Sequence, residues 1–130
     1  CSQKEIDWVD PSYQACEQEV GWPKTGSISW HLNHVAACKQ AYTADINNPH
    51  QENNESNWVI IRDIEQFNER LKAIHDDFIQ ACMNANPDIK IKSKEGQTLA
   101  GYIGIATRHE IWHAGQIALI RRLYKHACLK

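Results

Sequence analysis

Apolar residues recur three and four positions apart along three long stretches of this chain. The clearest stretch covers residues 58–85, where the repeat is formed by Ile61, Ile64, Phe67, Leu71, Ile74, Phe78 and Cys82. Such spacing puts the apolar side chains on one face of a helix, and that face must be buried against other elements. Similar patterns over residues 27–44 and 98–126 predict two further helices. Three long amphipathic helices are typical of an all-α helical bundle.

Polar residues at the start of each stretch indicate where the helices begin. Ser27 or Ser29 can cap the first helix, Ser56 or Asn57 the second, and Thr98 the third. In each case the side-chain oxygen can accept a hydrogen bond from a backbone N–H that the first helical turn leaves without a partner.

The segments outside these helices are expected to form connections. Residues 45–57 form a polar, asparagine-rich loop, and residues 87–96 form a second connection that is rich in lysine. Residues 1–25 are expected to be a mostly irregular lead-in, in which Pro11 suits the first position of a short helix. No convincing strand pattern appears. With 130 residues, the chain is expected to form a single domain.

Composition narrows the class of protein and its compartment. A formal net charge of −2 gives no general attraction to nucleic acid. No stretch approaches the ~18 uninterrupted apolar residues that a membrane span needs. The five cysteines form no CxxC pair, and nothing resembles a signal peptide. We therefore expect a cytoplasmic protein with reduced cysteines and with no nucleic-acid or membrane partner.

The strongest chemical signal is a pair of histidines, His109 and His113, four positions apart. On a helix they share a face and can both reach one metal ion. Together with Glu110 they also spell HExxH, in which the glutamate is the general base of zinc proteases. The protease interpretation is less favoured because residues 114–130 contain no acidic residue, and Gln116 stands where the extended motif requires glycine.

A third metal ligand is available on the first predicted helix. His31 and His34 are three positions apart there and lie close to the same face. Three neutral histidines with an open fourth position are the arrangement of many catalytic zinc sites. The spacing alone leaves these two histidines as alternatives.

The segments that carry the histidines resemble the motifs of the DinB-like family of damage-inducible, metal-binding helical bundles. Residues 26–35, GSISWHLNHV, are similar to the first histidine motif of that family, and residues 109–117, HEIWHAGQI, are similar to the motif on its last helix. Residues 2–8 also resemble the family segment that follows its first helix. The match of the first motif favours His34 over His31 as the third ligand.

This resemblance implies an up-down-down-up four-helix bundle with a long crossover between its second and third helices, assembled as a homodimer. The first of the four helices is expected to precede Cys1. The implied metal ligands are His34, His109 and His113, and the implied metal is zinc or nickel. Related proteins transfer low-molecular-weight thiols, as bacillithiol S-transferases and mycothiol-dependent isomerases do.

We therefore expect a divalent-metal-binding protein that activates a small thiol co-substrate, or water, for transfer to a small-molecule substrate or for its hydrolysis. Glu110 and Gln116 are the candidate catalytic residues. Glu110 is adjacent in sequence to a ligand, and Gln116 lies one turn beyond His113, from where it can orient an imidazole. The alternative is a non-catalytic metal-binding or stress-related interaction protein, and a zinc metalloprotease is a weaker one.

Overall fold

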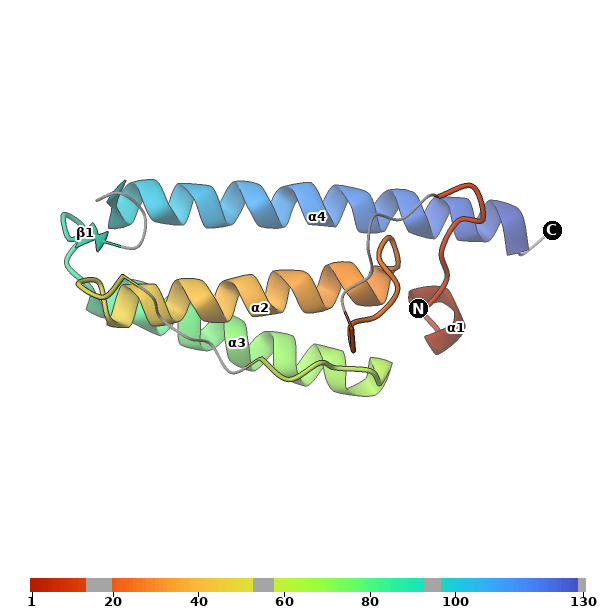
Figure 1. Ribbon diagram of the computed structural model, residues 1–130, viewed down its shortest axis with the longest axis horizontal. Coiled ribbons are helices and arrows are strands. Elements are labelled where there is room, and N and C mark those ends of the chain that lie inside the picture. Colours follow the sequence, from red (N-terminus) through yellow and green to blue (C-terminus); the bar gives the residue numbers. More distant parts are fainter. Residues whose placement is uncertain (14–19, 53–57, 93–96, 129–130) are drawn as a thin grey trace.

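Three long helices account for most of the chain in the computed structural model. The structure describes residues 1–13, 20–52, 58–92 and 97–128. The helices are α2 (Ile28–Asn47), α3 (Ile64–Asn84) and α4 (Leu99–Cys128) (Figure 1). The predicted all-α class is confirmed.

Two smaller elements accompany the long helices. The lead-in contains one helical turn, α1 (Gln3–Ile6), capped by the hydroxyl of Ser2. The strands β1 (Lys90–Ile91) and β2 (Gln97–Thr98) pair antiparallel between α3 and α4. Strands of two residues are too short to show the alternation by which a strand is recognised in a sequence, so these were not predicted.

α2 lies between the other two long helices and packs against both (Figure 1). The colours in Figure 1 show that α2 and α3 run in the same direction and that α4 runs in the opposite one. The connection from α2 to α3 must therefore return along the bundle. The same arrangement places the first half of α2 beside the middle of α4, and these are the segments that carry the histidine motifs.

The predicted helix starts are correct for two of the three helices. The hydroxyl of Ser27 accepts a hydrogen bond from the N–H of Trp30 at 3.0 Å, and that of Thr98 accepts one from Gly101 at 3.3 Å. The prediction for the middle helix, 58–85, is wrong at its start, because α3 begins at residue 64 and is capped by Asp63. The predicted caps of that helix, at residues 56 and 57, lie outside the described residues.

The other differences in the helices are small. α2 ends at residue 47 instead of 44, and α4 at residue 128 instead of 126. In the lead-in, the carboxylate of Asp10 accepts hydrogen bonds from the N–H and the hydroxyl of Ser12, so the described part of that segment forms a turn where the sequence suggested the start of a short helix.

Asn33 pairs with the extended chain before α3. Its side-chain amide donates to the carbonyl oxygens of Ser29 and Ile61, both at 2.9 Å, and accepts from the N–H of Ile61 at 2.8 Å. The backbone groups of Ile61 are thus paired with a side chain of α2 instead of entering a helix. Ile61 is buried, as its place in the apolar repeat predicted, but it reaches the core from an extended segment.

Two apolar clusters form the core, one on each side of a polar layer. The cluster next to β1 contains Ile46, Phe78, Ala81, Ile91, Leu99, Tyr102 and Ala106. The cluster next to α1 contains Ile6, Ile28, Ile61, Phe67 and Ile120. Between them along α2 and α4 lie the buried polar side chains His31, Lys39 and His113. Buried polar groups need partners inside the protein, so the side chains of this middle layer are expected to be paired with one another or with their neighbours.

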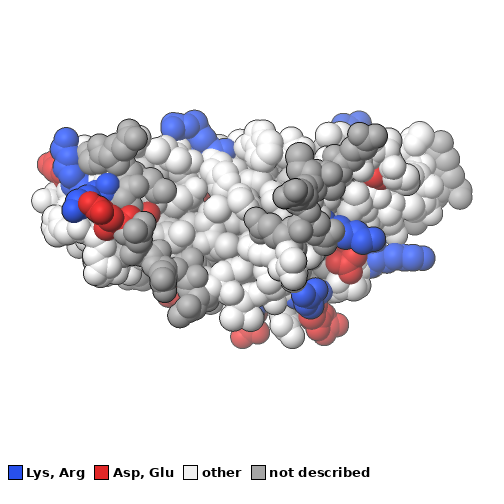
Figure 2. Space-filling view, viewed as in Figure 1, with Lys and Arg blue, Asp and Glu red and all other residues white. Residues whose placement is uncertain are grey.

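Charged side chains are sparse over the middle of the face shown in Figure 2. Lysine, arginine and acidic residues are drawn mainly towards its two ends, where both signs occur together. None of the helices in the described ranges is both long enough and apolar enough to cross a membrane.

Replacing Asn33 with alanine should destabilise the fold, because the buried N–H and C=O of Ile61 lose their partners. We expect the free energy of unfolding to fall by about 2–4 kcal/mol, which denaturant titration would measure. Asn68→Ala, an exposed change on α3, is the control and should stay within about 0.5 kcal/mol of the unmodified protein. Equal stability of the two variants would contradict the role given to Asn33.

Candidate metal centre

The antiparallel packing of α2 against α4 brings three histidines together. Their ligand nitrogens all lie within 4.8 Å of one another, and we call His34, His109 and His113 the three-histidine group. The Nε2 atom of His109 is 3.2 Å from that of His34 and 3.0 Å from that of His113. The three ligands predicted from the sequence therefore face one another across two helices.

These separations suit a single metal ion. Zinc binds histidine nitrogen at about 2.0–2.1 Å in tetrahedral sites, so two such nitrogens lie about 3.3 Å apart. A neutral imidazole carries one N–H, and three converging nitrogens leave lone pairs opposed unless a proton or a cation lies among them. The donor set of the three-histidine group thus fits a divalent ion that favours imidazole, such as zinc or nickel.

His31, the alternative third ligand, lies behind the group and not in it. Its Nδ1 atom is 2.8 Å from Nδ1 of His113, whose Nε2 atom faces His109. Both residues are almost fully buried. One nitrogen of His113 is therefore directed to the group while the other is held by His31. A partner on the far nitrogen fixes the tautomer and orientation of a ligand histidine.

Burial keeps these rings uncharged. Burial, together with the charges of neighbouring histidines, lowers the pKa of His31 and of His113 to about 4. Burial also lowers the pKa of His109, although the charge of Glu110 opposes the shift. Imidazole must be unprotonated to bind a metal, so the protein holds the site in its ligand form at neutral pH.

Two tryptophans pack against the imidazole rings. Trp30 stacks on His34, with ring centroids 4.9 Å apart and planes at 9°. Trp112 meets His113 edge-on at 4.7 Å. Nδ1 of His109 is buried and has no hydrogen-bond partner within the described ranges. The packing of aromatic rings therefore restrains His34, while His113 is restrained by both packing and a hydrogen bond.

Glu110 points to a different partner. Its carboxylate forms an ion pair with Nζ of Lys39 at 2.8 Å, and the same Nζ is 3.0 Å from Nδ1 of His75 on α3. The side chain of Lys39 is only 9% exposed, so its charge needs this carboxylate. The structure thus engages Glu110 with a buried lysine and does not include it in the three-histidine group.

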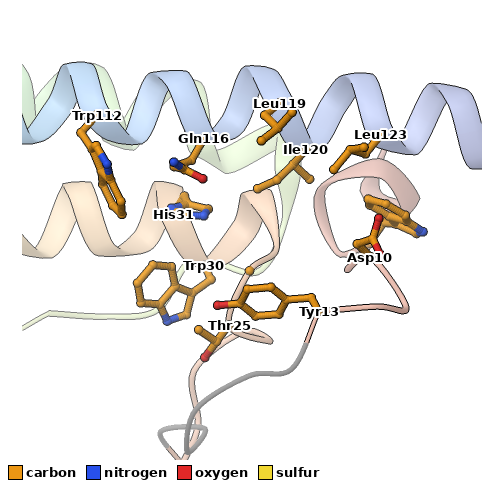
Figure 3. A pocket seen from close by; sticks show the side chains of 12 residues that line it. Asp10, Tyr13, Thr25, Trp30, His31, Trp112, Gln116, Leu119, Ile120 and Leu123 are labelled. Atoms are coloured by element: carbon orange, nitrogen blue, oxygen red, sulfur yellow. The ribbon is translucent and has the colours of Figure 1, made fainter.

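Gln116, the other candidate catalytic residue, lines a cavity of about 390 Å³ beside the centre. In Figure 3 its side chain extends from α4 toward His31 on α2. No hydrogen bond joins it to His113 within the described part of the chain, and His31 holds the position that the sequence suggested for Gln116. The other lining residues are largely aromatic or aliphatic and include Trp8, Tyr13, Trp30, Trp112, Leu119 and Leu123.

Sequence reasoning missed three side chains of this layer, namely His31 as the partner of His113, Lys39 as the partner of Glu110, and Cys38. The sulfur of Cys38 lies 3.6 Å from Nε2 of His34. A signal for Cys38 was present, because it follows His34 by four residues, as His113 follows His109. No comparable signal exists for Lys39, whose partners come from two other helices.

Comparisons with known proteins add nothing to this geometry. No protein-family model, no curated protein and no solved structure matches the chain.

We expect one zinc or nickel ion per chain, measured by elemental analysis of protein purified without a histidine tag. His109→Ala and His113→Ala should abolish stoichiometric binding, because each removes a converging nitrogen. His31→Ala should keep the stoichiometry but weaken affinity about 10–100-fold through the lost contact with His113. The control is His50→Ala, at an exposed position. Full occupancy in both ligand variants would place the metal elsewhere.

The metal-free protein should lose stability as the pH falls from about 6.5 towards about 4. In this window the unfolded chain protonates its histidines, whereas the pKa of His31 and of His113 in the folded protein is about 4. The unfolded state therefore binds more protons, and the free energy of unfolding decreases with falling pH. Thermal melting across this range would show the slope, and His31→Gln should reduce it while His50→Gln should not. A melting temperature that does not change with pH would contradict the burial of neutral rings.

Proposed function

We propose that this protein binds one divalent metal ion, zinc or nickel, through His34, His109 and His113. The observation that carries the proposal is the convergence of three imidazole nitrogens at separations close to those of a tetrahedral site. The uncharged state of the buried rings and the hydrogen-bonding partner behind His113 support it further.

The reaction that we propose is activation of a small thiol, or of water, against a small-molecule substrate. A divalent ion in such a site lowers the pKa of a coordinated thiol or water. In thiol transfer, the sulfur forms a bond to an electrophilic carbon, the leaving group departs with its bonding electron pair, and the thiol proton passes to solvent. The aromatic cavity beside His31 suits the apolar part of such an electrophile.

The arrangement of helices is compatible with a DinB-like protein, which we propose as the family. The three long helices run down, down and up, with the return connection between the first two of them. The fourth long helix of that fold remains part of the proposal, because α1 is a single turn.

A non-catalytic metal-binding role is the second candidate, and the position of Glu110 favours it. A general base needs a carboxylate free to take a proton beside the nucleophile. Here the carboxylate is paired with Lys39. The same contact weighs against a metalloprotease, for which this glutamate would be indispensable.

We expect the metal-loaded protein to accelerate the reaction of cysteine or glutathione with chlorodinitrobenzene, and His113→Ala to abolish the acceleration. Absorbance of the thioether product would follow the rate, and His50→Ala is the matched control. Metal binding without any acceleration would favour the non-catalytic candidate.

We also expect no cleavage of casein. Metal-dependent cleavage that is lost in Glu110→Gln would establish the protease instead.

A homodimer is part of the same proposal. Large apolar side chains are exposed along α4, among them Ile111 at 67%, Trp112 at 59% and Leu119 at 51%. Exposed apolar surface of this kind is common at protein interfaces. Light scattering should give the mass of two chains, and Ile111→Lys should reduce it to one. A monomeric unmodified protein would contradict the dimer without affecting the metal site.

A further inference from the structure

Cys38 is placed where a fourth ligand of the metal would come from. It follows His34 by one turn of α2, so both side chains lie on the face that meets α4. Its sulfur is 3.6 Å from Nε2 of His34, and this nitrogen is also the one that lies 3.2 Å from Nε2 of His109. The thiol therefore adjoins the converging nitrogens and not the back of a ring.

The distance between the sulfur of Cys38 and Nε2 of His34 can be compared with the separation of two ligands on one metal ion. Zinc–sulfur bonds are about 2.3 Å and zinc–nitrogen bonds about 2.0–2.1 Å, so a sulfur and a nitrogen bound to one tetrahedral ion lie about 3.5 Å apart. The contact between Cys38 and His34 has nearly this length. The sulfur is not yet within the set of ligand atoms that lie within 4.8 Å of one another. Cysteine has one rotatable side-chain bond, Cα–Cβ, about which the sulfur can change its position.

The other cysteines of the described chain have different surroundings. Cys82 packs against the apolar cluster next to β1, and Cys1 and Cys128 are exposed. Cys82 is, like Cys38, partly buried within a long helix, which makes it a matched control.

We propose that the Cys38 thiolate is the fourth ligand of the metal in the resting protein, an inference that rests on the proposed metal site. On binding, the sulfur gives its proton to solvent and closes the position that a substrate thiol or water would take. A site of three imidazoles and one thiolate favours zinc, cobalt or nickel over magnesium or manganese. An incoming small thiol would have to replace Cys38 as a ligand. The fourth coordination position would therefore stay occupied by Cys38 until that thiol binds.

Cobalt(II) provides the test, because a cobalt–thiolate bond gives an intense near-ultraviolet charge-transfer band that imidazole ligands do not give. We expect the unmodified protein and Cys82→Ser to bind one cobalt ion and to show the band. Cys38→Ser should still bind one cobalt ion but lose the band. X-ray absorption of the zinc-loaded, unmodified protein should independently show one sulfur at about 2.3 Å, and this measurement does not depend on the folding of a variant.

The possible failures are distinguishable. One bound cobalt ion without the band, together with zinc absorption lacking sulfur, would overturn the role of Cys38 and leave the three-histidine site intact. A band that persists in Cys38→Ser would assign the sulfur to another cysteine and would also overturn the inference. No stoichiometric binding of cobalt or zinc by the unmodified protein would overturn both the inference and the proposed function.

Discussion

The middle of the bundle depends on three imidazole nitrogens, those of His34, His109 and His113, which face one another across α2 and α4. Rings that face one another in this way need either a shared proton or a cation, and burial makes protonation unfavourable. The surrounding contacts maintain this situation: His31 holds the far side of His113, and Trp30 stacks on His34. These contacts restrain the ligand rings independently of an ion, which reduces the cost of ordering them on binding.

The apolar clusters on either side of the layer stabilise the fold and so offset the free-energy cost of burying polar side chains. Polar groups contribute little net stability when they are buried, even when they are paired. The clusters next to β1 and next to α1 each bury aliphatic and aromatic side chains from all three long helices. They clamp α2 against its neighbours at both ends, so the histidines between them are held by the packing of other residues. The two ends of the long helices thus stabilise the fold, while the layer between them carries the histidines.

Local spacing was sufficient to predict the three long helices and the pairing of His109 with His113, whereas His34 was favoured by the resemblance of residues 26–35 to a family motif. The start of α3 was not predictable in this way. The apolar repeat continues through Ile61, but the side chains of Asn33 and Gln3 hydrogen-bond to the backbone of residues 61, 62 and 64, and α3 begins only where these contacts end. The choice between His31 and His34 depends on how α2 is rotated against α4, which spacing does not determine. The partner of Glu110 depends on three helices meeting at Lys39.

The central position of α2 has a consequence for how this chain can change. Within two turns, α2 carries Asn33, His34, Cys38 and Lys39, which contact the segment before α3, two helices and the ligand nitrogens. Adding or removing one residue would rotate every later side chain by about 100° and separate these contacts together. Length variation should therefore be confined to the parts of the connections that make none of these contacts, while α2 keeps a constant length.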